Sequence, residues 1–454
     1  MGQVDLRGVE SLDQMHRRLK DGPNNSPIVR GHGYNQVMLK ERRHPRLDEL
    51  DTWFPNTPVV LAHSSGHMVV ANSLALQLAG VDKHRDDPPG GRIGRDVNGN
   101  LTGLLEENAQ GLMVEALPKP TIGELEEAIG RASRLYAEWG LTSTQEAGVG
   151  WHSEWEWAAW QNGWERGTLR NRVSLMPDVQ TLNLRNPGPP LYEGMRTGFG
   201  NDWLRLGPVK IFSDGSMIGH TAAMHDPYEN SEERGFLIYQ AAELMEMVER
   251  LHGADWQIAI HAIGDRAIDT VLDAYAHALE QYPKDDHRHR IEHAGVLTDR
   301  ALARVARLGV IPISQQHFIG ELGDTFRANV GDRTAISYRQ KSLIDAGLPL
   351  AGSSDCFVVD GRPLLGMHDA VNQRTASGAA YAPHEALTPY QALSAYTKGS
   401  AYVQRAERIK GMLMPTMLAD FVVLDRDPLG VDPRAIDQIK VVATFAGGHP
   451  TYQA

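Results

Sequence analysis

From about residue 130 onward, short apolar runs alternate with longer amphipathic stretches, and this alternation restricts the possible folds more than any other feature of the sequence. The short apolar runs predict strands at 141–145, 172–176, 208–212, 257–261, 290–293, 310–314 and 348–352. The amphipathic stretches between them predict helices at roughly 122–138, 240–252, 265–281, 299–308 and 333–346. Strands and helices that alternate at this spacing form βαβ units around a parallel sheet.

The predicted fold class is therefore α/β, and seven strands come close to the eight of a closed (β/α)8 barrel of the TIM type. An open doubly wound sheet is the alternative. No glycine-rich phosphate loop follows any of these strands, which weakens the nucleotide-binding version of that alternative.

Two regions interrupt the alternation and suggest the domain organisation. Residues at about 55–121 are rich in Gly, Asn, Asp and Pro, which predicts an insertion with turns or short hairpins. From about residue 409 the chain changes to strands joined by Asp and Pro turns, which predicts a small β unit. We expect a barrel domain at 1–408, with the insertion at about 55–121, and a β unit at 409–454.

Composition excludes several classes of protein. The formal net charge of −12 argues against broad binding to nucleic acid or to anionic membranes. No apolar run is long enough to span a bilayer, and the first ten residues lack the pattern of a signal peptide. The single cysteine, Cys356, excludes an internal disulfide and a multi-cysteine zinc site. We expect a cytoplasmic protein with a small-molecule substrate and no membrane or nucleic-acid partner, and a homo-oligomer stays open.

Four polar residues stand at or near the ends of predicted strands, which in a barrel form the active-site face. Lys210 lies in PVKIFSDG, His261 ends QIAIH, His293 ends RIEH, and Asp355 follows LPLAGSS. Imidazole and carboxylate groups are suitable ligands for a divalent metal. Singly, each residue also has a structural explanation: a capped histidine, an ion-paired lysine, a turn aspartate. Together, on four strands, they favour a metal site.

Other reactive residues fit this site less well. His287 and His289 precede their strand, so we expect them at the opposite end from the metal site. His63 and His67 lie in the insertion, which leaves open whether they reach the barrel mouth. Cys356 adjoins Asp355, but no histidine partner for a nucleophilic cysteine is apparent.

Several motifs along almost the whole chain resemble the amidohydrolase superfamily, specifically the amidohydrolase-3 branch with the proteins similar to N-substituted formamide deformylase. The motifs are VDLRGVES, SSGHMVVANSLAL, GLLEENAQ, GLTSTQEAG, VKIFSDGS, HAIGDRAID, RIEHAG, SQQHFIGELGD, AGSSDC and LADFVVLDRDPL. The resemblance implies a metal-bearing barrel, a β-sandwich built from both chain ends, and hydrolysis of amide or related C–N bonds. It implies that Lys210 is a carboxylated metal bridge, that His261 and His293 are ligands, and that Asp355 binds metal and serves as the catalytic acid and base.

The sequence departs from the family pattern at its start. The family's first barrel strand ends in His-x-His and supplies two ligands, and neither this strand nor the leading sandwich strands are found here. We therefore expect a barrel without its first strand and a C-terminal β-sandwich remnant with an unmatched edge. We also expect one metal ion, zinc, rather than two, and a chain that binds metal weakly and hydrolyses amides poorly.

The predicted function is a metal-dependent amidohydrolase that attacks its substrate with metal-activated water. The residues expected to contact the substrate are His67, Glu106, His220, Gln316 and His317, where His220 stands at the position of the family's usual arginine. Two alternatives remain: a non-catalytic barrel with a binding or regulatory role, and an ester or lactone hydrolase that uses the same site.

Overall fold

The computed structural model describes residues 3–22, 27–151, 153–182 and 194–454. The chain divides into two compact units. Unit 1 contains Met1–Pro120, Asp214–Ala223 and Glu233–Tyr239, and unit 2 contains Thr121–Ser213, Met224–Glu232 and Gln240–Ala454. The boundaries of these units differ from those of the predicted domains at 1–408 and 409–454. The predicted domains stay a prediction. Within the described residues, no helix combines the length and the apolar character needed to cross a membrane.

Unit 1 is built on a six-stranded sheet in the order β1-β2-β3-β4-β6-β5. Its first three strands are parallel and the others antiparallel. The hairpins predicted between 55 and 121 are confirmed as the pairs β3–β4 and β5–β6. The strands are β1 (Gln3–Asp5), β2 (Val29–Tyr34), β3 (Val59–His63), β4 (Met68–Ala71), β5 (Gly91–Arg95) and β6 (Leu101–Glu107), and the helices are α1 (Leu12–Lys20), α2 (Leu47–Trp53), α3 (Ser73–Leu78) and α4 (Gly111–Ala116).

Helix α1 illustrates how the sequence forms this unit. The Ser11 side chain accepts a hydrogen bond from the Gln14 backbone and caps the first turn. Leu12, Met15 and Leu19 recur at helical spacing and are all buried, so the helix packs one apolar face into the unit's core.

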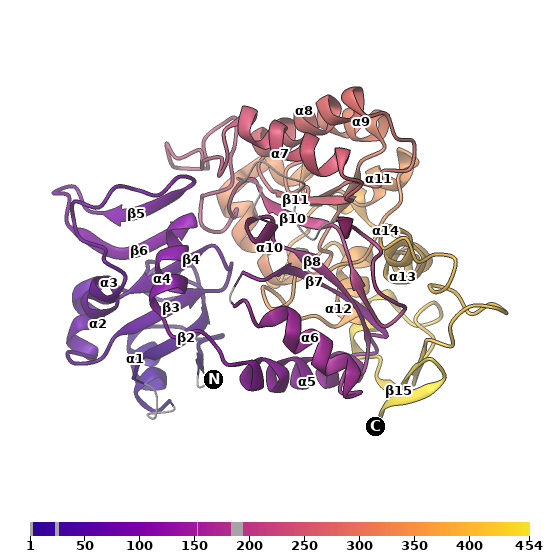
Figure 1. Cartoon of the computed structure of the whole chain (residues 1–454), viewed down its shortest axis with the longest axis horizontal. Coiled ribbons are helices and arrows are strands. Elements are labelled where there is room, and N and C mark those ends of the chain that lie inside the picture. Colours follow the sequence, from indigo (N-terminus) through magenta and orange to yellow (C-terminus); the bar gives the residue numbers. More distant parts are fainter. Residues whose placement is uncertain (1–2, 23–26, 152, 183–193) are drawn as a thin grey trace. The chain divides into compact units, whose positions relative to one another are not determined.

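Unit 2 contains two parallel sheets that correspond to six of the seven predicted strands (Figure 1). One sheet has the order β7-β8-β9 and the other β10-β11-β12-β13. Single bridges join Asp178 to Lys210 and Gln315 to Ser353, so the strand order continues at both ends of the second sheet. The strands are β7 (Ser143–Val149), β8 (Arg172–Pro177), β9 (Leu204–Leu206), β10 (Val209–Phe212), β11 (Ile258–Ala262), β12 (Arg290–His293) and β13 (Ile311–Ile313).

The helices of unit 2 match the prediction only in part. Those predicted at 122–138, 240–252, 265–281 and 299–308 are confirmed as α5 (Ile122–Glu138), α7 (Ala241–Gly253), α8 (Asp265–Gln281) and α9 (Asp299–Leu308). The single helix predicted at 333–346 is wrong: a 3-10 helix (Gly331–Ile336) and α11 (Lys341–Asp345) stand there instead. The helices not predicted are α6 (Glu156–Glu165), α10 (His317–Val330), α12 (Pro363–Asn372), α13 (Pro389–Ser394) and α14 (Ser400–Val403), with a π-helical turn (Ala395–Gly399) between the last two.

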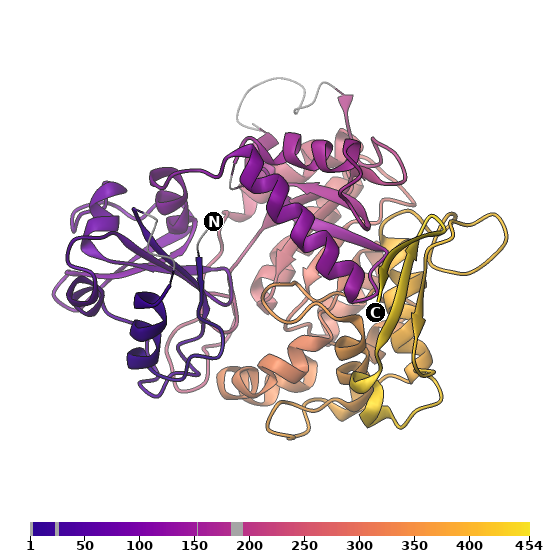
Figure 2. The ribbon, with the colours of Figure 1, turned by 90° about the horizontal axis from the view of Figure 1, so that it is seen from below.

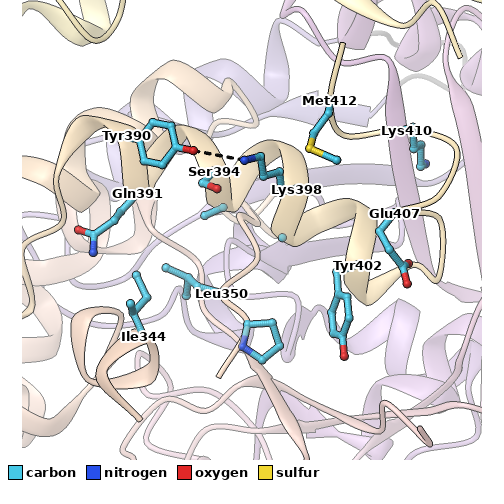
Figure 3. A pocket seen from close by; sticks show the side chains of 13 residues that line it. Ile344, Leu350, Tyr390, Gln391, Ser394, Lys398, Tyr402, Glu407, Lys410 and Met412 are labelled. Atoms are coloured by element: carbon cyan, nitrogen blue, oxygen red, sulfur yellow. Dashed lines mark hydrogen bonds between the residues drawn. The ribbon is translucent and has the colours of Figure 1, made fainter. Parts of the chain in front are cut away.

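The described residues have an α/β fold with separate sheets that do not close into a barrel. The strand predicted at 348–352 is absent. The reason is that this segment bonds to other partners. Gly352 donates its backbone N–H to Ala395, and Ala351 accepts a hydrogen bond from the Gln316 side chain at 3.3 Å. Figure 3 shows Leu350 facing the helical run that carries Ser394 and Lys398. The backbone of 348–352 is thus held mainly by helix and side-chain contacts, not by a strand ladder.

The C-terminal segment forms an antiparallel sheet of β14 (Phe421–Leu424), β15 (Val441–Ala446) and β16 (His449–Gln453), which lies beside α5 (Figure 2). Arg172 in β8 holds the sheet through a bidentate ion pair with Asp420, at 2.7 and 2.9 Å. The β structure predicted for 409–454 is confirmed. β14 lies at one edge of this sheet, where Val422 and Val423 are 38% and 41% exposed, and the loss of sandwich partners stays a prediction.

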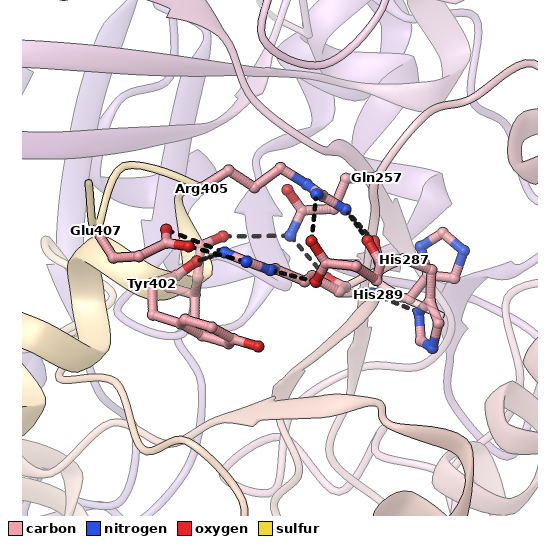
Figure 4. Close-up of polar contacts among 9 residues, drawn as sticks. Gln257, His287, His289, Tyr402, Arg405 and Glu407 are labelled. Atoms are coloured by element: carbon pink, nitrogen blue, oxygen red, sulfur yellow. Dashed lines mark hydrogen bonds and ion pairs between the residues drawn. The ribbon is translucent and has the colours of Figure 1, made fainter. Parts of the chain in front are cut away.

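A polar network joins the amino ends of β11 and β12 to the loop after α14 (Figure 4). Arg288 pairs with Glu407 at 2.9 Å and lies 3.9 Å over the Tyr402 ring, and Arg405 donates to the carbonyl of His287 at 2.8 Å. Gln257 donates to the carbonyl of Arg288 at 2.6 Å. Each charged group is satisfied, so the network stabilises this end of the sheet.

Three buried histidines lie at the same end. His289 accepts a hydrogen bond from the Ile258 backbone at Nδ1 (3.1 Å) and donates from Nε2 to Nδ1 of His252 (2.8 Å). His252 donates its single ring N–H, at Nε2, to the carbonyl of Tyr282, and His287 donates from Nε2 to the carbonyl of Leu308. These bonds use one proton per ring, and burial lowers the pKa of all three imidazoles. The interpretation of His287 and His289 as structural residues at the amino end of the strand fits this geometry.

The histidine cluster predicts loss of stability in acid. Because the folded pKa values lie below the ordinary value near 6.5, the unfolded chain binds more protons below that pH, and stability falls as pH drops from about 6.5. We expect His289→Gln to cost about 1–3 kcal/mol at pH 7.5, because Ile258 and His252 lose a partner, and to flatten the acid slope. Urea unfolding at pH 7.5, 6.0 and 5.0 measures both, with His277→Gln as the partly exposed control. An unchanged slope in His289→Gln contradicts the assignment.

The ion pair between Asp369 and His317 predicts loss of stability in alkali, the opposite of the histidine cluster. Buried Asp369 in α12 accepts from His317 in α10 (2.6 Å) and from His368 (2.8 Å), and the His317 pKa rises to about 9 through its bonds to Asp369 and Glu321, against the effect of burial. Because the folded pKa is raised, protonated His317 stabilises the fold by about 3 kcal/mol. This stabilisation is fully present below about pH 6.5 and is lost as the pH rises to about 9. We expect Asp369→Asn to lose most of this alkaline slope in urea unfolding. Asp324→Asn, on the same helix α10, should keep the slope of the parent chain.

Candidate functional site

Three of the four predicted metal residues lie in the four-stranded parallel sheet of unit 2. Lys210 is in β10, His261 in β11, and His293 is the last residue of β12. In the strand register His261 stands opposite Phe212, and His293 opposite Ala262. Because carboxyl ends of parallel strands share one edge of a sheet, the two histidines lie near the same edge.

The backbone at the end of β12 brings His293 to His261. Strict alternation would place His293 on the face opposite to Glu292. His293 and Ala294, however, have positive φ angles of 72° and 46°, which end the strand with a turn. The His293 ring then lies 4.5 Å from the ring of His261, centroid to centroid, in an edge-to-face arrangement. A left-handed conformation at a residue with a side chain costs about 1–3 kcal/mol and is often found at functional sites.

Hydrogen bonds hold the ring of His293 and the backbone of His261. The ring Nδ1 of His293 contacts Oε1 of Gln315 at 2.8 Å. Because the amide oxygen accepts, Nδ1 carries the proton and Nε2 keeps its lone pair. The carbonyl of His261 accepts from both the backbone and the side chain of Ser213, which holds this end of β11 to the end of β10.

Burial sets the protonation of the site. Lys210, His261 and His293 are at most 4% exposed. Burial, followed by the charge of His261, depresses the pKa of His293 well below its ordinary value, so this imidazole is neutral at pH 7. Burial also lowers the pKa of Lys210, and the carboxylates of Glu292 and Asp355 oppose that effect. Neutral imidazoles are the form that binds metal.

Asp355 differs from the other three residues. It is exposed, follows the 348–352 segment and has a φ of 57°. Its charge acts on both Lys210 and His293, which places it in the same electrostatic environment. Over the part of the chain that the structure describes, however, no three His, Cys, Asp or Glu side chains are grouped so that they could hold a metal ion. The donor types therefore fit a divalent metal, with two imidazoles in contact and no third such ligand in place.

Further polar residues of this region were not identified from the sequence. Asp178 follows β8, forms a bridge with Lys210, and has a pKa raised to about 6 by burial. Glu292 is ion-paired with Arg290 at 2.7 Å, and Arg290 also donates to Gln145 at 2.6 Å. Gln315 directly follows the predicted strand 310–314, and Asp178 is the second residue after the predicted strand 172–176. A search for polar residues at strand ends could therefore also have found them.

The predicted substrate residues are divided between the two units. His67, Glu106 and His220 belong to unit 1. There His67 contacts Glu107 at 2.7 Å, Glu106 pairs with Arg92 at 2.5 Å, and His220 has a φ of 58°. His63 and His67 both belong to unit 1, and whether they contact a substrate stays a prediction.

Gln316 and His317 belong to unit 2, and both are engaged in internal contacts. Gln316 accepts a hydrogen bond from the Ser353 backbone at 3.1 Å and donates to Ala351, so it holds the segment that leads to Asp355. His317 is bound to Asp369. Substrate contact by these five residues stays a prediction.

Comparison with known proteins gives the family. The sequence profile of the amidohydrolase family matches residues 1–452. The chain is 29% identical to putative amidohydrolase YtcJ of Bacillus subtilis, over 99% of this chain and 85% of the relative. It is 28% identical to N-substituted formamide deformylase of Arthrobacter pascens, over 98% of this chain and 82% of the relative. Among solved structures, a metal-dependent hydrolase of Pyrococcus horikoshii matches with a TM-score of 0.74 and 29% identity, over 95% of this chain and 83% of that one. The match along nearly the whole length places this chain in the amidohydrolase family.

Proposed function

We propose that this chain hydrolyses amides or related C–N bonds with the help of one divalent metal ion, zinc, bound by His261 and His293. The pair of buried imidazoles, with rings 4.5 Å apart near the carboxyl ends of neighbouring strands, carries the proposal. The similarity to a metal-dependent hydrolase and to an N-substituted formamide deformylase supports it. N-Substituted formamides are therefore the first substrates to test.

We also propose that the two parallel sheets are parts of one (β/α)8 barrel. The bridges between Asp178 and Lys210 and between Gln315 and Ser353 support this, since they extend the strand order beyond the four-stranded sheet. A cytoplasmic location, a small-molecule partner and a homo-oligomer stay predictions from the sequence.

Each residue of the site has a role in the proposed reaction. His261 and His293 would hold the metal ion, and Gln315 keeps Nε2 of His293 available by accepting a hydrogen bond from Nδ1–H. A divalent ion bound there would lower the pKa of its water to near 7 and polarise the substrate carbonyl. Asp355 accepts a proton from the attacking water and returns it to the leaving nitrogen.

Lys210 is the proposed third ligand, after carboxylation. A neutral amine adds carbon dioxide and becomes an anionic carbamate, and burial favours the neutral amine by lowering its pKa. Carboxylated Lys210 and a reoriented Asp355 would then complete the ligand set that two histidines alone do not supply.

A non-catalytic binding protein is the second candidate. The observation that favours it is the missing third ligand, because no group of three His, Cys, Asp or Glu among the described residues is arranged for a metal. Metal content separates the two candidates directly.

We expect His261→Ala and His293→Ala to lose bound zinc and to lower formamide hydrolysis more than about 100-fold. Loss of a residue that hydrogen-bonds to a metal ligand costs about 10–100-fold, and loss of the ligand itself should cost more. Metal analysis and turnover of a matched pair, an N-substituted formamide and the formate ester of the same group, measure this. His277→Ala, on the surface of α8, should match the parent. A parent chain that binds no zinc and hydrolyses neither compound supports the binding protein instead, and faster turnover of the ester supports the esterase.

Gln315 offers a sharper test of the metal site. Gln315→Ala should weaken zinc binding about 10–100-fold, because the His293 ring loses the acceptor that sets its orientation. Gln315→Glu keeps an acceptor at the same place and should recover most of the affinity. Competition with a zinc chelator measures the Kd of each variant. Equal affinities in all three chains would mean that His293 is not a ligand.

A further inference from the structure

Lys410 is a second buried lysine of unit 2, and it lies far along the sequence from the residues of the proposed metal site. Its side chain is 9% exposed and lines two cavities of about 440 and 420 Å³. Figure 3 shows it at the edge of the first cavity, beyond Met412 and near Glu407. A buried amine beside open space has room to take a small molecule.

The hydrogen-bonding of Lys410 is poor for an ammonium ion. Nζ donates to Oε1 of Gln404 at 2.7 Å, and this neutral amide is its one hydrogen-bond acceptor among the residues that the structure describes. No carboxylate of the described ranges lies within ion-pair distance of Nζ. A charge buried with a single neutral partner is unfavourable, so the amine is favoured over the ammonium.

The surrounding charges act in the same direction. Arg205 donates to the backbone carbonyl of the same Gln404, so two cationic side chains converge on one residue. Arg172 also repels a proton on Lys410, whereas Asp420 and Asp202 attract it. Asp420 is already engaged, because its two oxygens accept from Arg172 and one accepts from the Gly447 backbone at 2.7 Å. The site thus has cationic groups in excess of available carboxylates.

This environment holds the pKa of Lys410 at about 7, with burial as the largest cause. At pH 7.5 about three quarters of such amines are neutral, against about one in a thousand at the ordinary value. Neutral amines are nucleophiles, and a nearby guanidinium favours an anionic product.

We propose that Lys410 is a carbon dioxide-binding residue that forms a reversible carbamate paired with Arg205. The lone pair of Nζ attacks the carbon of CO2 and forms an N–C bond while one C=O electron pair moves onto oxygen. The nitrogen then releases one proton to water and leaves Nζ–COO⁻. The reaction requires no oxidant and no metal, and acid or removal of CO2 reverses it.

The carbamate is measured on the full 454-residue chain in sealed buffer with ¹³C-bicarbonate at pH 7.5. Treatment with triethyloxonium converts a carbamate into a stable ethyl carbamate, and peptide mass spectrometry locates it. Lys398 is the internal control, because it lines the same cavity but is exposed and contacts Tyr390 at 3.2 Å. We expect at least tenfold more ¹³C-labelled product at Lys410 than at Lys398, and loss of that product when the bicarbonate is removed before trapping.

Variants test the role of the charges. Arg205→Gln should lower the trapped fraction at Lys410 at least threefold and leave Lys398 unchanged, because the variant lacks the cation that disfavours the ammonium and pairs with the carbamate. Lys410→Gln should lose the corresponding ¹³C signal. If either variant fails to fold, as judged by circular dichroism, the labelling of the parent chain decides alone. Labelling of Lys410 equal to or below that of Lys398, or labelling that persists without bicarbonate, overturns the proposal.

Discussion

The parallel register of β10, β11 and β12 is the constraint on which the proposed site depends. It sets Lys210 beside Ala259 and Arg290, and Phe212 beside His261 and Glu292. A slip by one residue would move every side chain of a strand to the other face. Apolar side chains prevent this slip: Val209, Ile211, Ile258, Ile260 and Ile291 have no exposed surface. The positions of the reactive groups are therefore fixed by residues that take no part in the chemistry.

The two ends of this sheet differ in how their polar groups are satisfied. At the amino end, His252, His287 and His289 use both ring nitrogens in hydrogen bonds, and Arg288 is bound to Glu407 and Tyr402. After β13, by contrast, the buried Oγ atom of Ser314 finds no partner among the described residues. Buried polar atoms without partners are uncommon in native proteins and call for water, an ion or a ligand. The amino end is therefore built for stability, while polar capacity remains beyond it.

The strength of the local pattern explains how much of the fold could be predicted from the sequence. Six of the seven predicted strands of unit 2 exist, and the clearest of them, such as β11 (IAIHA) and β13 (IPI), are short apolar runs whose neighbours also form strands. The seventh, 348–352, has the same composition but bonds to Gln316 and to Ala395, and a sequence pattern cannot show which partner a backbone group chooses. In unit 1, strand β2 reads VRGHGY, where glycines weaken the strand signal, and the parallel strands β1 to β3 were not predicted.

The sequence also predicted only part of the candidate site. Placement at strand ends identified Lys210, His261 and His293, but the contact between the two rings depends on the positive φ of His293, which the sequence does not encode in any simple pattern. Gln315 follows a predicted strand, but its contact with His293 was not predicted because the sequence does not show which side chain the His293 ring reaches.

The two buried lysines show why residue type alone does not determine chemistry. Burial lowers the pKa of both, but Lys210 faces the carboxylates of Glu292, Asp355 and Asp178, which favour its charged form. Lys410 is surrounded by the charges of Arg205 and Arg172, and the carboxylate that most favours its protonated form, Asp420, is engaged by Arg172. An anionic carbamate on Lys210 would therefore be repelled by the nearby carboxylates unless a bound cation offset their charge. A carbamate on Lys410 would instead be stabilised by the nearby arginines. The two environments thus match the two proposals, a carbamate that depends on a metal ion at Lys210 and one that forms without a metal ion at Lys410.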